Sequence, residues 1–324
     1  MPITVVGSIA YDTVKTPFGE RERMLGGAAV HFALAARFFD HVRIVGPVGE
    51  DFAASDLDLI RKRGIDVSDV EHVPGGRTFF WRGEYGWDLN SRDTLATELG
   101  VFEGFQPKLS GSSRDSEILF LANIQPDLQR EVRAQLPGAR FVALDSMNLW
   151  IDTARDSLLQ AIASVDCVIL NDAELRQLTR KPNLVSAARE LLAWAQAGGG
   201  APHAGRRGPS VIVAKQGEYG AALITAESFF SLPAYPLETV IDPTGAGDTF
   251  AGGLVGYIAA HPQGELSDEL LRRAMAHATV LASFNVEEFG TQRVARLTAE
   301  EIVARMGELR EITQFSDAPL PLRA

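Results

Sequence analysis

Residues 242–253 read DPTGAGDTFAGG and join a glycine-rich loop to an apolar helix pattern. Pro243 and Gly245 interrupt regular structure, so the stretch is expected to begin as a loop. From Thr249 onward the sequence has helical periodicity. The apolar face of this helix consists of residues four positions apart, namely Phe250, Leu254 and Ile258. The glycines are therefore predicted to lie at the N-terminus of a helix.

The turn formed by Gly245, Ala246 and Gly247 is predicted to bind an anion. The first N–H groups of a helix have no partner within the helix, and the helix dipole places positive charge at the same end. Glycine also lets the backbone approach a phosphate without a clash from Cβ. Asp248 would repel an anion there unless it has a task, such as taking a proton from a hydroxyl that attacks a phosphoryl group. The alternative is that Asp248 caps the helix.

Short apolar runs alternate with helical patterns along the rest of the chain. Strands are predicted for residues 3–8, 42–48, 118–122, 141–145, 165–170 and 211–214. Helices are predicted for residues 25–39, 53–63, 129–135, 153–163, 174–178 and 185–197. This order predicts an α/β fold, with a central, mostly parallel sheet and helices on both faces.

Two segments interrupt this alternation. Residues 77–102 are aromatic, alternating and rich in charge, and residues 11–24 are similar. Both are predicted to form antiparallel strands outside the main sheet and together to build a small lid, with an ordinary surface excursion as the alternative. The chain is thus predicted to be one domain over residues 1–315, followed by a tail at 316–324. Residues 198–209 (GGGAPHAGRRGP) are predicted to be a loop.

The composition argues against several classes of protein. The chain of 324 residues carries 31 Lys and Arg against 42 Asp and Glu, a net charge of −11, which disfavours nucleic acid as a partner. The longest weakly polar stretch, residues 249–260, is too short for a membrane span. No basic leader precedes the first apolar run. Cys167 is the single cysteine, so disulfides and cysteine metal sites are not expected. A cytoplasmic location is expected.

The stretch DPTGAGDTFAGG is similar to the C-terminal signature of the ribokinase-like (PfkB) carbohydrate kinase family. Further motifs that resemble those of the family occur in the family's order over residues 3–312. They are the first substrate motif with Asp12, the second with Gly26 and Gly27, the Asn-x-x-Glu element with Asn171 and Glu174, and the nucleotide-contacting turn of residues 215–220 (KQGEYG).

The resemblance implies an ATP-dependent kinase that transfers the γ-phosphate to a hydroxyl of a sugar or sugar-like small molecule. Asp248 would be the general base, and the amides of residues 245–247 would stabilise the transferring phosphoryl group. Asn171 and Glu174 would hold Mg²⁺ through water; the alternative, which does not exclude this role, is a helix-capping pair. The other nucleotide-binding residues that the resemblance implies are Lys215, Gly217, Gly220 and Thr244. The alternative for the lysine is a solvated strand end.

The implied substrate side consists of Asp12, Gly26, Gly27, His31 and Asn123. Ribokinases carry Asn, Lys, Asn and Glu where this chain has Ala10, Ala28, His31 and Asn123. Because hydrogen-bonded sites discriminate strongly between substrates, these changes disfavour free ribose. His31 is either a replacement ligand for a hydroxyl or a histidine at the core edge. The aromatic residues of the lid either stack on a base or sugar, or form the lid's own core or a dimer contact.

Several alternatives stay open within this interpretation. A nucleoside kinase of the same family is one, and a non-catalytic member that binds ligand is another, although the retained Asp248 argues against it. A phosphorylated sugar would need cationic residues, for which Arg82 and Arg92 are the obvious candidates. The resemblance also implies K⁺ beside the anion site, held by Asp242 and the Thr244 carbonyl with the loop at 283–290, and a homodimer through the lid.

Overall fold

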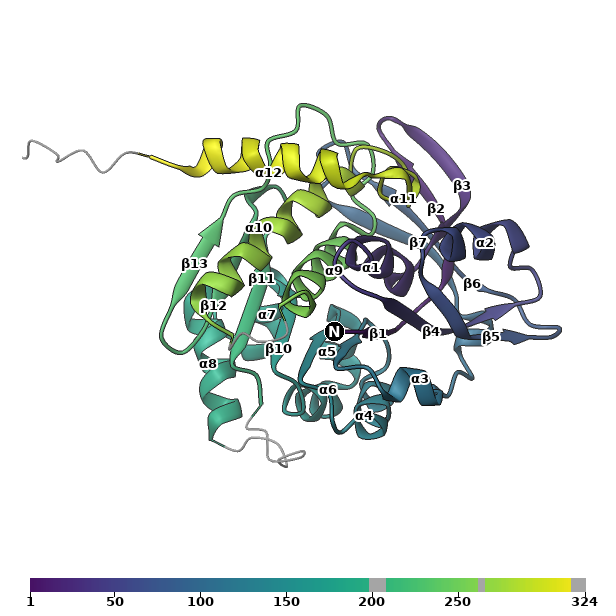
Figure 1. The fold of residues 1–324 in the computed structure, drawn as a ribbon, viewed down its shortest axis with the longest axis horizontal. Coiled ribbons are helices and arrows are strands. Elements are labelled where there is room, and N and C mark those ends of the chain that lie inside the picture. Colours follow the sequence, from purple (N-terminus) through teal and green to yellow (C-terminus); the bar gives the residue numbers. More distant parts are fainter. Residues whose placement is uncertain (198–207, 262–265, 316–324) are drawn as a thin grey trace, which may run out of the picture.

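The computed structural model describes residues 1–197, 208–261 and 266–315. A nine-stranded sheet in the order β13-β12-β11-β10-β9-β8-β1-β4-β5 runs through the molecule (Figure 1). Its strands are β1 (Ile3–Val6), β4 (Val42–Gly49), β5 (Asp66–Val73), β8 (Ile118–Leu121), β9 (Phe141–Asp145), β10 (Cys167–Asn171), β11 (Val211–Lys215), β12 (Ala221–Ile224) and β13 (Phe229–Leu232). Neighbours from β5 to β11 pair in parallel, and β12 and β13 pair antiparallel at one edge. The predicted mostly parallel sheet is confirmed.

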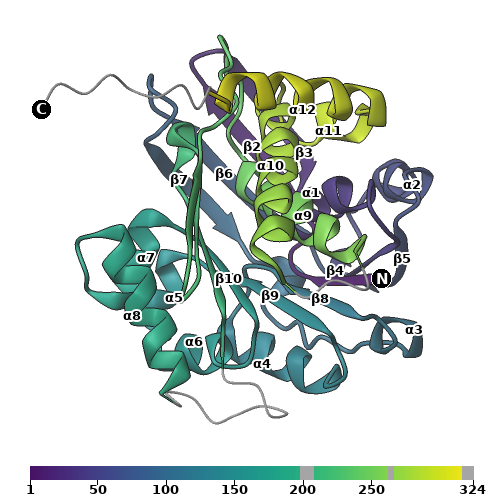
Figure 2. The same ribbon diagram turned by 60° about the vertical axis from the view of Figure 1, so that its left-hand side comes forward.

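Helices cover both faces of the sheet (Figure 2). One face carries α1 (Ala28–Ala36), α2 (Ala54–Lys62), α9 (Ala246–Ala259), α10 (Asp268–Asn285), α11 (Gln292–Arg296) and, outside them, α12 (Ala299–Thr313). The other face carries α4 (Pro126–Gln135), α5 (Asn148–Thr153), α6 (Arg155–Ile162), α7 (Asp172–Thr179) and α8 (Leu184–Gln196). A short helix, α3 (Gly111–Arg114), precedes β8. The α/β alternation predicted from the sequence therefore corresponds to a three-layer arrangement.

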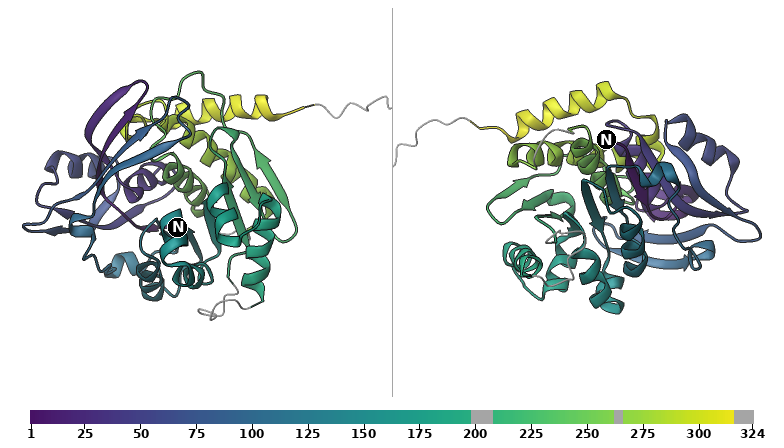
Figure 3. Two further views of the ribbon diagram at one scale, coloured as in Figure 1. Left: turned by 180° about the vertical axis from the view of Figure 1, so that it is seen from behind. Right: turned by 60° about the horizontal axis from the view of Figure 1, so that its bottom comes forward.

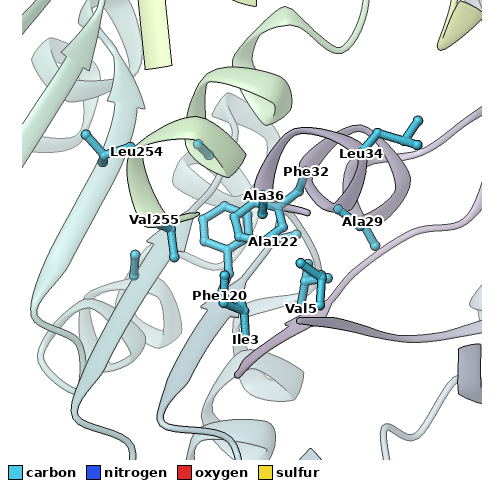
Figure 4. Packing of buried hydrophobic residues seen from close by; sticks show 14 of the residues in the cluster. Ile3, Val5, Ala29, Phe32, Leu34, Ala36, Phe120, Ala122, Leu254 and Val255 are labelled. Carbon is cyan, nitrogen blue, oxygen red and sulfur yellow. The ribbon is translucent and has the colours of Figure 1, made fainter. Parts of the chain in front are cut away.

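Alternate residues of each central strand belong to different cores. On β10, Cys167 and Ile169 pack on the side of α9, whereas Val168 and Leu170 pack on the opposite side. In the first core, the Phe32 ring of α1 stacks on Phe120 of β8 with ring centroids 4.2 Å apart (Figure 4). Burial on both faces is the reason that these strands are continuous apolar runs in the sequence.

The predicted lid is a separate four-stranded sheet in the order β3-β2-β6-β7 (Figure 3). Its strands are β2 (Ala10–Thr16), β3 (Gly19–Gly26), β6 (Phe79–Tyr85) and β7 (Arg92–Glu98). Each of the two predicted segments folds as an antiparallel hairpin. The hairpins join through a parallel pairing of β2 with β6. Two distant parts of the chain thus become one sheet, which neither hairpin's sequence encodes alone.

Glycines let α9 lie unusually close to its two neighbouring helices. A Cβ on Gly252 would lie 2.3 Å from the Phe32 carbonyl oxygen of α1. A Cβ on Gly253 would lie 2.8 Å from the Ala278 Cα of α10. Gly252 and Gly253 are therefore required by helix packing.

Two further expectations concern the chain as a whole. Within the described residues, no helix combines the length and apolar character that crossing a membrane requires. The predicted loop at 198–209 lies outside the described residues except for its last two positions, and the predicted tail at 316–324 lies wholly outside them.

The substitution Gly252→Ala is expected to destabilise the fold by about 1–3 kcal/mol, because its Cβ would overlap the backbone of α1. Gly307→Ala is the matched control, since Gly307 is a glycine of α12 with open space around its Cβ position. There alanine should stabilise by about 0.5–1 kcal/mol through helix propensity. Urea unfolding measures both, and equal effects of the two substitutions would contradict the packing argument.

Candidate active site

The glycine-rich turn forms the start of α9. Gly245 is the N-cap, with φ of 74°, in the left-handed region that favours glycine. The helix begins at Ala246, three residues before the start of the sequence pattern. The Ala246 N–H donates to the Pro243 carbonyl at 3.2 Å, whereas the N–H groups of Gly245 and Gly247 donate to no group in the described part of the chain. These two amides are available to an anion, and so is that of Asp248, which likewise donates to no carbonyl there. The turn of residues 245–247 is called the anion turn below.

Asp248 lies in the first turn of α9, three residues beyond the N-cap, so the alternative that it caps the helix is wrong. Burial raises the pKa of Asp248 to about 7, with the nearby Asp145 raising it further and Lys215 opposing the rise. A carboxylate with a pKa near neutrality accepts a proton much more readily than an ordinary aspartate.

Lys215 connects the end of the main sheet to the anion turn. Its Nζ donates to Asp145 Oδ2 at 2.9 Å, and each residue is the last of its strand. A Cβ on Gly247 would lie 3.0 Å from this Nζ, so the ammonium group lies against the turn. Burial lowers the pKa of Lys215, but Asp145 and Glu174 reverse this and leave it above its usual value. The alternative of a solvated strand end is therefore wrong, and Asp145 is a site residue that the sequence analysis missed.

Asn171 and Glu174 form a capping box at the start of α7. Asn171 Oδ1 accepts from the Glu174 N–H at 2.7 Å, and Glu174 Oε2 accepts from the Asn171 N–H at 2.8 Å. Burial raises the pKa of Glu174 to about 7, and Lys215 opposes this. The described residues contain no group of three or more His, Cys, Asp or Glu placed to hold a metal ion. This donor set fits Mg²⁺ bound mainly by waters and phosphate oxygens.

The two substrate motifs meet where β2, β3 and α1 come together. A Cβ on Gly26 would lie 2.0 Å from Asp12 Oδ2, and one on Gly27 would lie 2.4 Å from the Ser8 carbonyl oxygen. Gly26 therefore makes room for the Asp12 carboxylate, and Gly27 for the backbone that follows β1. Burial raises the pKa of Asp12 to about 7, and Asp242 and Asp248 contribute to the rise. Asp12 is thus electrostatically coupled to Asp248.

The other two predicted substrate residues, Asn123 and His31, lie in different places and contact other parts of the protein. Asn123 Oδ1 accepts from the Trp150 Nε1–H of α5 at 3.0 Å, so its side chain serves a contact within the protein. His31 is 2% exposed, and its Nδ1 lies 3.0 Å from Asn285 Oδ1. Its ring lies beside Gly245, because a Cβ there would be 2.3 Å from the ring. His31 therefore belongs to the surroundings of the anion turn.

The lid reaches the anion turn and the nucleotide-contacting turn. Thr244 Oγ1 donates to the Tyr85 hydroxyl of β6 at 3.2 Å. Asn90 Nδ2, between β6 and β7, donates to Glu218 Oε1 at 3.1 Å. Glu218 lies in η2 (Gly217–Tyr219), between β11 and β12, where Gly217 and the following Gly220 have positive φ. The lid thus bridges the two regions predicted to bind the nucleotide.

The aromatic residues of the lid do not form one stacking surface. Phe79 packs on Phe102 with ring centroids 5.7 Å apart, and Phe102 in turn packs against a core of the main sheet. Tyr85 contacts the anion turn, and Trp87 is 89% exposed. Arg92 lies over the Trp81 ring and lowers the pKa of Asp248 and Glu174 through its charge.

The oxygens predicted to hold K⁺ are already hydrogen-bonded. Asp242 accepts from the Thr244 N–H and the Gly290 N–H, each at 2.9 Å. The Thr244 carbonyl accepts from Asn285 Nδ2 at 2.7 Å. In the loop at 283–290, Glu287 pairs with Arg293 and Arg305. Each of these oxygens keeps a further lone pair, so the K⁺ site stays a prediction.

The chain is similar in sequence to known kinases over most of its length. The family model described as "pfkB family carbohydrate kinase" matches residues 112–297, more than half of the chain. A cytidine kinase of Thermococcus kodakarensis is 29% identical over 86% of this chain and 95% of its own length. A ribokinase of Lactococcus lactis is 25% identical over 95% of this chain and 97% of its own length.

Solved structures share the fold over nearly the whole chain. The nucleoside kinase of Burkholderia thailandensis in complex with ADP-inosine superposes with a TM-score of 0.77 at 21% identity, covering 99% of both chains. Arabidopsis thaliana ribokinase complexed with ribose and ATP gives a TM-score of 0.72 at 20% identity, covering 94% of this chain and 98% of its own. With its glycine-rich turn, its β lid and these relatives, the chain belongs to the pfkB family of carbohydrate kinases and is a small-molecule kinase.

Proposed function

We propose that the protein transfers the γ-phosphate of ATP to a hydroxyl of a nucleoside, with a sugar as the second candidate. The observation that carries the phosphoryl transfer is the position of Asp248 in the first turn of α9, directly after Gly247, which lies beside the Lys215 ammonium group. The cytidine kinase relative, which spans most of the chain, favours a nucleoside. The ribokinase relative, which spans 95% of the chain, keeps the sugar as a candidate.

Each residue then has a distinct task. Asp248 removes the proton from the attacking hydroxyl, and its pKa of about 7 suits a base that works near neutrality. The free amides of Gly245 and Gly247 stabilise the charge on the transferring phosphoryl group, which is where preorganised donors are most effective. Lys215 adds a positive charge at the same place.

Other groups position the two substrates. Asp12 accepts hydrogen bonds from acceptor hydroxyls on the far side of the site. Glu174, with Asn171, holds water molecules of Mg²⁺, which when bound neutralises phosphate charge. Tyr85 and Asn90 close the lid, which excludes water and so limits hydrolysis of ATP. A homodimer through the lid belongs to the proposal, supported by the exposed apolar residues Phe18, Trp87 and Leu95 on the lid hairpins.

The function is tested by ADP formation from Mg-ATP across cytidine, uridine, adenosine, inosine, ribose and fructose. At least one nucleoside is expected to raise the rate well above the rate without an acceptor. Turnover with sugars alone would replace the nucleoside by a sugar. If no compound raised the rate while calorimetry showed ATP binding, the non-catalytic alternative would stand.

Asp248→Asn is expected to lower kcat by at least about 10²-fold, because the base is removed while the shape is kept. Its affinity for Mg-ATP should stay within about twofold, since no nucleotide contact is lost. Asp156→Asn, the same change at an exposed position of α6, is the control and should keep full activity. Equal kcat values for the two variants would show that Asp248 is not the base.

The pH dependence follows from the raised pKa of Asp248. The base acts only when deprotonated, so kcat/KM should rise about tenfold per pH unit below the pKa and level off above about 7. Glu174 and Asp12 also titrate near 7, so the profile is repeated with Glu174→Gln and with Asp12→Asn, in both of which the rising limb should persist. A limb with its midpoint near 4, the usual aspartate value, would contradict the assignment.

A further inference from the structure

Asn285, the last residue of α10, is fully buried and uses its side-chain amide on three different elements. Its Nδ2 donates to the Thr244 carbonyl at 2.7 Å. Its Oδ1 lies 3.0 Å from Thr249 Oγ1 and 3.0 Å from His31 Nδ1. Thr244 precedes the anion turn and Thr249 follows Asp248. The amide therefore contacts the residues on both sides of segment 245–248, which carries the free N–H groups and Asp248.

These contacts determine where the hydrogens lie. A carbonyl oxygen only accepts, so the group of Asn285 that faces Thr244 must be the NH₂ group. Its Oδ1 is then an acceptor, and both Thr249 Oγ1 and His31 Nδ1 must donate to it. His31 is neutral over the physiological range, because burial lowers its pKa to about 4. It therefore carries its proton on Nδ1, and the buried Nε2, which has no partner in the described part of the chain, is a bare acceptor.

We propose that Asn285 is a positioning residue of the anion turn. We propose further that His31, as its Nδ1–H tautomer, holds the Asn285 amide in this orientation. The inference rests on the proposed function, in which this turn stabilises the transferring phosphoryl group. His31 acts in two ways: its N–H orients Asn285, and its ring fills the space beside Gly245. Misplacing donors by about 1 Å can cost about 10²-fold in rate, so loss of this hydrogen-bond network is expected to lower kcat.

Two variants separate the ring from the hydrogen bond. His31→Phe keeps an aromatic ring beside Gly245 but removes the donor to Asn285. His31→Gln keeps an N–H that reaches Asn285 and gives up the ring. We expect kcat to fall by about 10- to 10²-fold in His31→Phe, with KM for both substrates within about threefold, and to recover most of that loss in His31→Gln. Full kcat in His31→Phe would overturn the proposal.

Asn285→Asp serves where His31→Phe fails to fold, as judged from its thermal melting. It keeps the size of the side chain and removes the donor to the Thr244 carbonyl. Its kcat is expected to fall by at least about 10-fold. An unchanged kcat in this variant would also overturn the proposal.

Two measurements do not depend on turnover. In ¹⁵N spectra of the imidazoles, the His31 signals, identified by their loss in His31→Gln, should show a protonated Nδ1; a protonated Nε2 would overturn the proposal. Amide hydrogen exchange over residues 242–250 should become at least about 10-fold faster in Asn285→Asp, and unchanged exchange would overturn it. If the native protein phosphorylated no acceptor but met both expectations, the proposed function would fail while the positioning role would stand.

Discussion

Close packing of α9 between α1 and α10 is the constraint on which the site depends. Gly252 and Gly253 allow backbone contact on both sides of α9. The start of α9 is thereby brought beside His31 of α1 and Asn285 of α10. The same packing aims the helix N-terminus at the carboxyl ends of β9, β10 and β11, the edge at which ligands bind in open α/β sheets. A larger side chain at Gly252 would shift the anion turn as well as the core.

Carboxylates dominate the electrostatics of the site. Burial raises the pKa values of Asp12, Glu174 and Asp248 to about 7, and the charge of Lys215 opposes the rise at Glu174 and Asp248. Because the folded-state pKa values are raised, these groups favour folding at low pH and disfavour it as the pH rises through about 7. The chain thus gives up stability to keep titratable groups where proton transfer and Mg-ATP binding would use them.

Much of the fold could be predicted because strands buried on both faces leave a direct pattern. The predicted strands correspond to β1, β4, β8, β9, β10 and β11, and β9 agrees at both ends. Three strands were missed. The outer residues of β5 and β13 face water and interrupt the apolar run, and β12 is only four residues long. The pairing of β2 with β6 was not predictable, since register between distant hairpins depends on long-range contacts.

Local motifs alone determined the anion turn, the capping box of Asn171 with Glu174, and the place of Asp248 in the chain, because each depends on residues within a few positions of one another. The tertiary structure decided what those motifs meet. It paired Lys215 with Asp145, engaged Asn123 with Trp150, and placed His31 beside Gly245 and Asn285. The physical reason is that a side chain's partner is set by which distant elements pack beside it, and sequence spacing carries no such information.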